Sequence, residues 1–437
     1  MNLRIKYNSK FILETITFQF ILLYAMFARI LEITEIGNKV MVVLLGLCIV
    51  KHLNQAERLL VTRWKNVAIL IAIGLLMIAN VLVIGQNGYL VSNVLIIAYS
   101  SIFALSINYL TTIMGDELTK LLDRNFWLIN LFWVANLVVL FLQIQGTGFL
   151  IRSEWLAINP YYPDHCSGLF GNSGTHELAF FSTFWFIYNW TYAYGKKNSQ
   201  TPKVILVYTV LTMGVMLLFS LKNDNKAFYA LLFVIGGLYY LLAQLWRYGK
   251  WRRILGRLIA ICICAGFAFI VLLRIPEFRQ AIHKYASQVI SILKVDYQVA
   301  NGGNERLAIF KYALKHGGGW GLGSGLGLYS VVQNKAEVFN HFSINSMGAM
   351  TFLGGVWYYL GHCWLFGICF AQNINKPYKK IWMTLVGVVI YVGLSLYSNI
   401  FSTGVSMVWI AMMSVTLRNL FAENQKRRAA RVIKKEN

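Results

Sequence analysis

Apolar residues fill most of the chain in stretches of about 20, with short polar segments between them. A helical stretch of that length matches the hydrocarbon thickness of a bilayer, so each one predicts a membrane-spanning helix. The pattern predicts an all-α polytopic membrane protein, with about twelve transmembrane helices in one integral-membrane domain over residues 1–437. The expected spans are 11–31, 37–53, 66–85, 89–112, 126–145, 178–195, 204–221, 227–246, 254–275, 344–371, 381–399 and 401–418.

One polar interruption is far longer than the others and predicts a large extracytoplasmic loop with short helices over residues 276–343. A connection of that length is too long for a simple turn. Within it, residues 277–294 place apolar side chains at a helical period, which predicts an amphipathic helix on the outer membrane surface. Asn304 is a candidate N-cap for a second helix that ends at about His316. The side chains that we expect this helix to bury are Leu307, Phe310 and Leu314.

Composition excludes an ordinary soluble protein, because 57% of the residues are hydrophobic and only 13% are charged. A net charge of +23 could indicate a nucleic-acid partner. The positions of the basic residues along the chain favour membrane topology as the explanation instead. With the N-terminus inside, the cytoplasmic segments hold 27 of the 40 Lys and Arg residues, as the positive-inside rule requires. We therefore expect a multi-pass protein of the cytoplasmic (inner) membrane, with both termini in the cytoplasm and no nucleic-acid partner.

The six cysteines lie almost entirely inside apolar stretches, so they indicate neither a disulfide framework nor a zinc site. The sequence predicts no metal and no cofactor. The polar groups that are candidates for chemistry gather in the expected outer loops.

Arg306 is the first candidate, because the expected helix after Asn304 puts it beside a helix N-terminus. A guanidinium in that place can hold a phosphate through two parallel hydrogen bonds, helped by the helix dipole. The alternative is an interfacial arginine that reaches toward lipid head groups.

His341 is the second candidate, because it precedes the tenth expected span and an imidazole suits a general base. The alternative for His341 is a hydrogen-bonded interfacial histidine, and position alone does not choose.

Other polar groups of the outer loops are candidates for binding a substrate. Lys222 and Lys226 flank a short turn where two ammonium groups can neutralise a diphosphate, while Asp224 between them fits a merely structural loop equally well. Arg152 and His165 belong to a loop whose mixture of charge and aromatic rings suits carbohydrate, and also suits the aromatic belt of a membrane protein. Further acid–base candidates at the head of the sixth span are His176 and Glu177.

The run from Gly317 to Gly327 is rich in glycine and superficially resembles a nucleotide-binding loop. The strand that must precede such a loop is missing, and the predicted topology puts the run outside the cell, so we reject that interpretation. A flexible turn that allows a close approach of two backbones is sufficient to explain the glycines.

Several segments, taken in order, resemble the O-antigen ligase and polymerase superfamily. Those proteins show an arginine that opens a loop helix, a Gly-x-Gly turn, and a histidine before a glycine-spaced helix. In this chain the earlier basic position is Lys226, where arginine is usual, and His341 is preceded rather than followed by asparagine. The similar segments are Gly168 to Asn172, Ser220 to Leu231, Asn304 to Leu314, Gly321 to Gly325, and His341 with Gly348 and Gly354.

The resemblance implies a metal-independent glycosyl transfer on the outer face of the membrane, with a polyprenyl-diphosphate sugar as donor. In that chemistry Arg306, helped by Lys226, holds the diphosphate, and His341 deprotonates the acceptor hydroxyl that attacks the anomeric carbon. The implied partners are the polyprenyl-diphosphate-linked oligosaccharide, the growing glycan or an acceptor lipid, membrane lipids, and also a chain-length regulator and a flippase.

The favoured function is a polysaccharide polymerase that extends capsule or O-antigen chains from lipid-linked repeat units. One alternative with the same chemistry is a ligase that moves a finished glycan to another acceptor. An alternative from a different class is a flippase or exporter of the lipid-linked oligosaccharide, which predicts charged residues inside several spans. The expected spans hold few charges, with Glu14 and Arg29 as the main exceptions, and this favours the enzyme.

Overall fold

Helices form all the regular structure in the part of the chain that the computed structural model describes, and no strand occurs there. That part comprises residues 9–52, 64–85, 88–151, 163–171, 174–195, 201–223, 305–333, 335–371, 377–401 and 404–416, with isolated positions from 225 to 283. The helices are α1 (Ile12–Phe27), α2 (Thr34–Lys51), α4 (Trp64–Ile84), α5 (Leu90–Met114), α6 (Asp116–Arg124), α7 (Phe126–Ile144), α9 (Thr175–Gly195), α10 (Thr201–Lys222), α14 (Glu305–His316), α15 (Ser346–Phe370), α16 (Pro377–Tyr397) and Val405–Thr416. Short 3-10 turns are η1 (Ser9–Phe11), η2 (Pro163–His165), η3 (Gly168–Phe170) and η6 (Phe342–Ile344).

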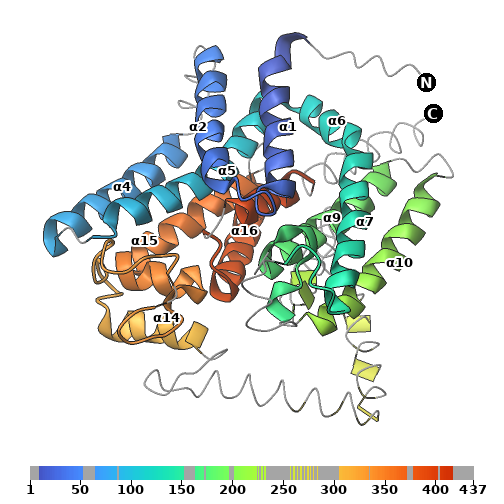
Figure 1. Ribbon diagram of the computed structural model, residues 1–437. Helices are drawn as coiled ribbons and strands as arrows, with labels where there is room; N and C mark the ends of the chain where they lie inside the picture. Colours follow the sequence, from blue (N-terminus) through green and yellow to red (C-terminus); the bar gives the residue numbers. More distant parts are fainter. Residues whose placement is uncertain are drawn as a thin grey trace.

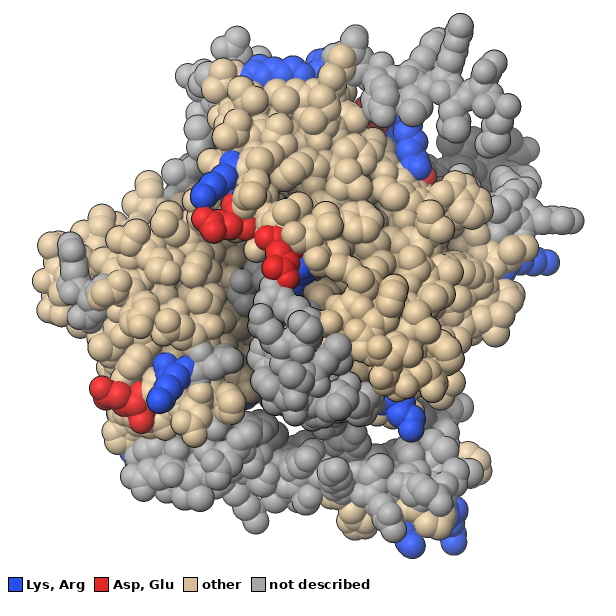
Figure 2. Space-filling model, viewed as in Figure 1, with Lys and Arg blue, Asp and Glu red and all other residues tan. Residues whose placement is uncertain are grey.

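The expected spans can be compared with these helices one by one. The spans 227–246 and 254–275 and the amphipathic helix over 277–294 lie mostly outside the described residues, and each of the other expected spans coincides with a described helix. Among the described residues, three helices are long and apolar enough to cross a membrane, and shorter apolar helices accompany them. Charged side chains are few and scattered on the face shown in Figure 2. The three long helices are Leu90–Met114, Phe126–Ile144 and Lys203–Lys222.

Figure 1 shows two ends of the bundle, with α1, α2 and α6 at the top and α14 at the bottom. We call these the α6 end and the α14 end. The charge distribution along the sequence predicts that the α6 end faces the cytoplasm and the α14 end faces outward. Helix α6 occupies a segment that the sequence predicts as an inner loop, and its leucines are buried against the bundle.

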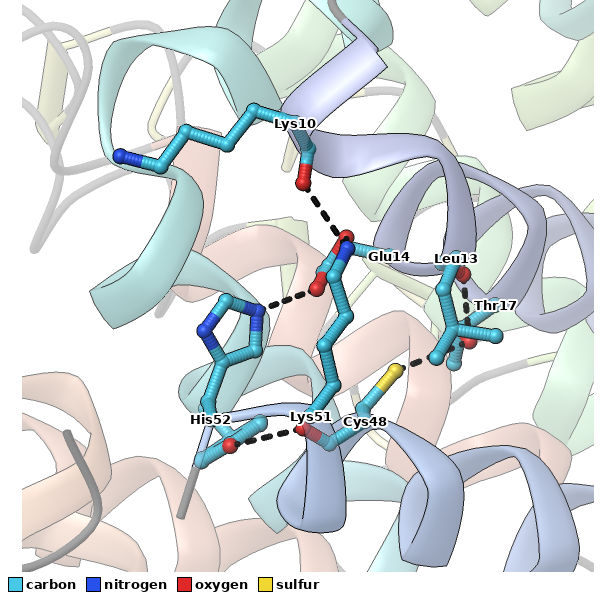
Figure 3. A network of polar contacts seen from close by, with 8 residues as sticks. Lys10, Leu13, Glu14, Thr17, Cys48, Lys51 and His52 are labelled. Atoms are coloured by element: carbon cyan, nitrogen blue, oxygen red, sulfur yellow. Dashed lines mark hydrogen bonds and ion pairs between the residues drawn. The ribbon is translucent and has the colours of Figure 1, made fainter. Parts of the chain in front are cut away.

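A buried carboxylate joins α1 to the end of α2 near the α6 end (Figure 3). Glu14 is fully buried, accepts a hydrogen bond from Nζ of Lys51 at 2.8 Å, and pairs with Nε2 of His52. Nζ of Lys51 also donates to the backbone carbonyl of Lys10 at 2.8 Å. The charge that interrupts the first apolar stretch therefore has its partners on the neighbouring helix.

The interior is packed around the helix Val405–Thr416, whose residues are all buried. The ring of Trp409 packs on Phe181 of α9, with 4.7 Å between the ring centres. Trp185, one turn further along α9, stacks on Trp133 of α7 at 4.2 Å. Aromatic side chains thus bind the last described helix to the middle of the bundle, because large flat rings bury much apolar surface.

Helix α14 confirms the second helix predicted in the large loop, but the prediction of its buried face is wrong. Leu307, Phe310 and Leu314 are only half-buried. The protein-facing side of α14 is made of smaller side chains, because close packing on α15 leaves little room: a Cβ added at Gly348 would come within 2.6 Å of the Ile309 side chain. The residues that α14 does bury are Ala308, Ile309 and Ala313.

Helix α15 is broken at Gly355, whose φ of 86° lies in the left-handed region. The glycine run crosses α15 at this point, and the N–H groups of Ser324 and Gly325 donate to the carbonyls of Phe352 and Leu353 at 2.7 and 3.0 Å. In an unbroken helix those two carbonyls accept hydrogen bonds from the next turn. The run makes the close backbone approach that its glycines predict, and it is hydrogen-bonded into the helix.

Two buried asparagines hold the same loop. Asn80, in the last turns of α4, donates to the carbonyl of Leu322 and accepts the N–H of Leu326 at 3.0 Å. Asn93, in the first turn of α5, donates to the carbonyls of Leu326 and Tyr329 at 2.6 and 2.7 Å. An amide side chain is both donor and acceptor, so it satisfies backbone groups that apolar surroundings leave unpaired.

We predict that Gly323→Ala destabilises the protein by more than about 1 kcal/mol, whereas Gly214→Ala does not. The φ of Gly323 is 79°, and an added Cβ would lie 2.6 Å from the backbone nitrogen of Gly355. Gly214 lies inside α10, with nothing within 4 Å of an added Cβ. The thermal midpoints of the two purified variants in detergent check this, and equal midpoints would contradict the crossing of the loop and α15.

Candidate functional site

Asn345 joins the starts of α14 and α15. Its Oδ1 accepts the N–H of Gly348 at 2.6 Å, which is the geometry of a helix N-cap. Its Nδ2 donates to the backbone carbonyl of Arg306 at 2.8 Å. The N-terminal turns of two helices therefore meet at Arg306, and the positive ends of both helix dipoles favour an anion there.

The Arg306 side chain is half-buried and turns toward the end of α16. Its Nε donates to the carbonyl of Tyr397 at 2.8 Å, and its Cζ lies 5.0 Å from the centre of the Tyr397 ring. The carbonyl end of a helix and the face of an aromatic ring both attract a cation. Among the described residues, Nη1 and Nη2 have no hydrogen-bond partner, so the bidentate edge of the guanidinium is available for an anion.

His176, the second residue of α9, packs on the same tyrosine. The centre of its ring is 5.2 Å from that of Tyr397, with the two planes at 64°. Its Nδ1 is buried and has no hydrogen-bond partner within the described parts of the chain. A buried polar atom without a partner costs free energy, so a hydrogen bond from a group that reached Nδ1 would be favourable.

Glu177 follows His176 and forms an ion pair across the bundle. Nη1 of Arg29, just beyond the end of α1, donates to Oε1 of Glu177 at 2.6 Å. The carboxylate is only 2% exposed, so it depends on this partner. Arg29, the cation in the first expected span, is therefore neutralised by Glu177, which lies just before the sixth expected span.

Burial lowers the pKa of His176, which precedes the expected span 178–195, to about 4. The positive charges of Arg306 and Arg29 lower this pKa further, and the negative charge of Glu177 acts in the opposite direction. His176 is therefore neutral at physiological pH. A neutral imidazole beside two guanidinium groups can accept a proton while anions bind next to it.

The other predicted site residues do not join this group through any contact that the structure describes. His341 is exposed on the turn before η6, and no hydrogen bond or ring contact links it to Arg306 in the described part of the chain. Lys222 is exposed at the end of α10, and His165 is buried in η2. The predicted site residues that lie outside the described residues are Arg152 and Lys226.

The residues that follow Lys222 and His165 in the sequence are hydrogen-bonded to each other. Nδ2 of Asn223 donates to the backbone carbonyl of Cys166 at 2.8 Å, and both residues are buried. This hydrogen bond ties the end of α10 to the loop between α7 and α9. The structure therefore brings together two candidates that the sequence predicts in separate outer loops.

Arg29 and Tyr397 belong to the group around Arg306, although the sequence does not predict them as site residues. A signal for Arg29 exists, because a lone cation in an apolar stretch needs an anionic partner and Glu177 heads another stretch. Tyr397 carries no such signal. Its role depends on its place at the end of α16, which only the folded chain reveals.

Comparison with known proteins does not identify the chain, since no protein-family model and no curated protein matches it. Among the described residues, no group of three or more His, Cys, Asp or Glu side chains could hold a metal ion. The group around Arg306 offers two guanidinium groups, an imidazole and a carboxylate at one end of a mostly apolar helical bundle.

We predict that Arg29→Met and Glu177→Gln are each destabilising, and that the double variant is less destabilised than their sum by about 0.5–3 kcal/mol. Removing Arg29 alone takes this cation from a buried carboxylate, a change that typically costs about 3–5 kcal/mol. Thermal midpoints in detergent measure the cycle. Lys39→Met, which breaks an exposed pair with Glu35, is the control and should leave the midpoint unchanged. Additive single effects would show that the buried pair does not couple.

Proposed function

We propose that the chain is a polysaccharide polymerase. It is a membrane-embedded glycosyltransferase that joins polyprenyl-diphosphate-linked oligosaccharide repeat units on the outer face of the cytoplasmic membrane. The observation that carries the proposal is the gathering of Arg306, His176 and Arg29 at one end of an apolar bundle, where Nη1 and Nη2 of Arg306 have no hydrogen-bond partner among the described residues. The order of the sequence segments that resemble polymerases and ligases supports it independently.

The chemistry needs a cation for the leaving diphosphate and a base for the acceptor. Arg306 stabilises the charge that develops on the diphosphate as it leaves, because its guanidinium is already oriented by Tyr397 before the substrate binds. The predicted binding residues Lys226, Lys222, Arg152 and His165 would add positive charge for the diphosphate and contacts for the sugar, although neither Lys222 nor His165 contacts the group around Arg306 among the described residues. His341 is the base that the resemblance implies. A donor of this kind needs its head group at the membrane surface, which is where the charge distribution predicts the α14 end.

The buried charges favour this enzyme over a flippase or exporter. A transporter needs polar or charged groups along a path through the bundle. The buried carboxylates of the described residues are Glu14 and Glu177, and each is held in an ion pair. Glu14 lies at the start of α1, whereas Glu177 is paired with Arg29 beyond its other end. Both buried carboxylates are therefore neutralised by a cation of the protein, which disfavours a charged transport path through the described part of the bundle.

We predict that Arg306→Ala reduces the rate of polymer formation by at least about 100-fold, as the loss of a group that stabilises transition-state charge typically does. Lys315→Ala, an exposed cation in the last turn of the same helix, is the matched control and should keep the normal chain lengths. The measurement is the chain-length distribution of surface glycan in cells with equal amounts of each variant. A full distribution with Arg306→Ala would contradict the role proposed for Arg306.

We also predict that deleting the gene causes single lipid-linked repeat units to accumulate on the outer leaflet. A polymerase consumes those units, so they remain when it is missing. Extraction of lipid-linked material from separated leaflets checks this. Long unattached chains would indicate a ligase instead, and units retained on the inner leaflet would indicate a flippase.

A further inference from the structure

His176 is a titratable group of the α14 end that the proposed function leaves without a role. It is half-buried, and its Nδ1 has no hydrogen-bond partner within the described residues. Its ring packs on Tyr397 at 5.2 Å, and the guanidinium of Arg306 packs on the same ring at 5.0 Å. One tyrosine therefore supports both an imidazole and the cation that the proposed function assigns to the leaving group.

The shared contact with Tyr397 limits how far apart the imidazole and the guanidinium lie. The centre of the His176 ring and Cζ of Arg306 are 5.2 and 5.0 Å from the centre of the Tyr397 ring, so they are at most about 10 Å apart. In inverting glycosidases, the two catalytic carboxyl groups that flank an anomeric carbon stand about 6.5–9.5 Å apart. The upper limit is compatible with a sugar that places its diphosphate on Arg306 and its anomeric carbon next to an acceptor hydroxyl at His176.

The surrounding charges determine when His176 is a good base. Burial and the positive charges of Arg306 and Arg29 lower its pKa, Glu177 acts in the opposite direction, and Tyr397 packs on its ring. A diphosphate bound at Arg306 brings negative charge, which raises the pKa of the imidazole toward neutrality. Binding of the donor thus strengthens the base just before the proton is transferred.

We infer that His176 is a catalytic base of the glycosyl transfer, an assignment that rests on the proposed function. The acceptor hydroxyl gives its proton to an imidazole nitrogen of His176 while its oxygen bonds to the anomeric carbon. The bond from that carbon to the diphosphate oxygen breaks, and the diphosphate leaves with the electron pair, held by Arg306. The imidazolium then releases its proton to water. The role implied for His341 by resemblance passes to His176.

Glu177 and Arg29 are positioning residues in this scheme. Their ion pair joins the first turn of α9 to the end of α1, and so fixes the backbone that carries His176. The N–H of Leu178 also donates to the carbonyl of Gly174 at 2.9 Å, which continues the helix up to the loop before it. The imidazole is thus held by packing on Tyr397 and by the backbone of α9.

The test uses the full-length protein reconstituted in lipid vesicles, with purified polyprenyl-diphosphate-linked repeat units as the donor and acceptor. Initial rates of polymer formation are compared for the wild type, His176→Gln, His341→Gln and Arg306→Ala. We expect His176→Gln to lower the rate by at least about 100-fold, the usual contribution of a general base, and His341→Gln to lower it much less. Binding of the donor to His176→Gln should stay within about threefold of the wild type, since the base contributes to the transfer rather than to affinity.

The outcomes separate this inference from the function on which it rests. A large loss with Arg306→Ala but a near-normal rate with His176→Gln would overturn the role of His176 and leave the polymerase intact. Normal rates with both variants would overturn the roles of Arg306 and His176, whereas a wild-type protein that forms no polymer would overturn the polymerase itself. A large loss of rate with His341→Gln and a near-normal rate with His176→Gln would show that His341 is the base.

The pH dependence of the wild type gives a second readout if His176→Gln does not fold. At low donor concentration the rate reports the free enzyme, in which His176 keeps its basic form down to about pH 4. The rate should therefore stay level as the pH falls from 8 through about 6.5, the ordinary titration range of an imidazole, and drop only near the lower value. A drop centred near pH 6.5 would assign the proton to a different histidine.

Discussion

Backbone groups that enter an apolar bundle must find their hydrogen-bond partners inside the protein, because a bilayer offers none. This chain meets that constraint with amide side chains carried by its helices. Asn80 and Asn93 hold the glycine run, Asn136 and Gln143 hold the turn at η3, and Asn345 holds the first turn of α14. An amide can donate and accept at once, so a single side chain such as Asn80 or Asn93 can hold two backbone segments of a loop. The described parts of these loops are consequently hydrogen-bonded to the helices beside them.

The candidate site depends on those fixed loops. Its side chains come from the end of α1, the start of α9, the start of α14 and the end of α16, which are far apart in the sequence. Tyr397 contacts both Arg306 and His176, so the spacing of cation and imidazole is set by one aromatic ring. The ion pair of Arg29 and Glu177 joins the group through the residue that follows His176. The charged side chains are therefore oriented by contacts within the protein rather than by a ligand.

The sequence predicts the helices well, because the length and hydrophobicity of a stretch are local properties. It also predicts α14 from Asn304 to about His316, where the helix runs from Glu305 to His316. The break at Gly355 is missed, since a hydrophobic window over 344–371 does not register which backbone will cross it. The buried face of α14 is mispredicted for a related reason: the closeness of α15, rather than the size of the apolar side chains, decides which residues turn inward.

Residues of the site divide in the same way. Arg306 is predicted from a short local pattern, and the structure places it at the meeting point of two helix N-termini. Its neighbours His176 and Tyr397 come from other helices. Their contact with each other depends on tertiary packing, which cannot be predicted from their spacing along the chain. Arg29 lies between these cases, because an unpaired charge in an apolar stretch signals that a partner exists without saying which one it is.

The aromatic packing of the helix Val405–Thr416 has a consequence for biogenesis. Translation proceeds from the N-terminus, so this helix is the last of the described helices to leave the ribosome. Until it arrives, the rings of Phe181 and Phe184 lack the indole of Trp409 that covers them in the finished molecule. The aromatic packing around Phe181 and Phe184 is therefore complete only after the helix Val405–Thr416 has docked between the earlier helices.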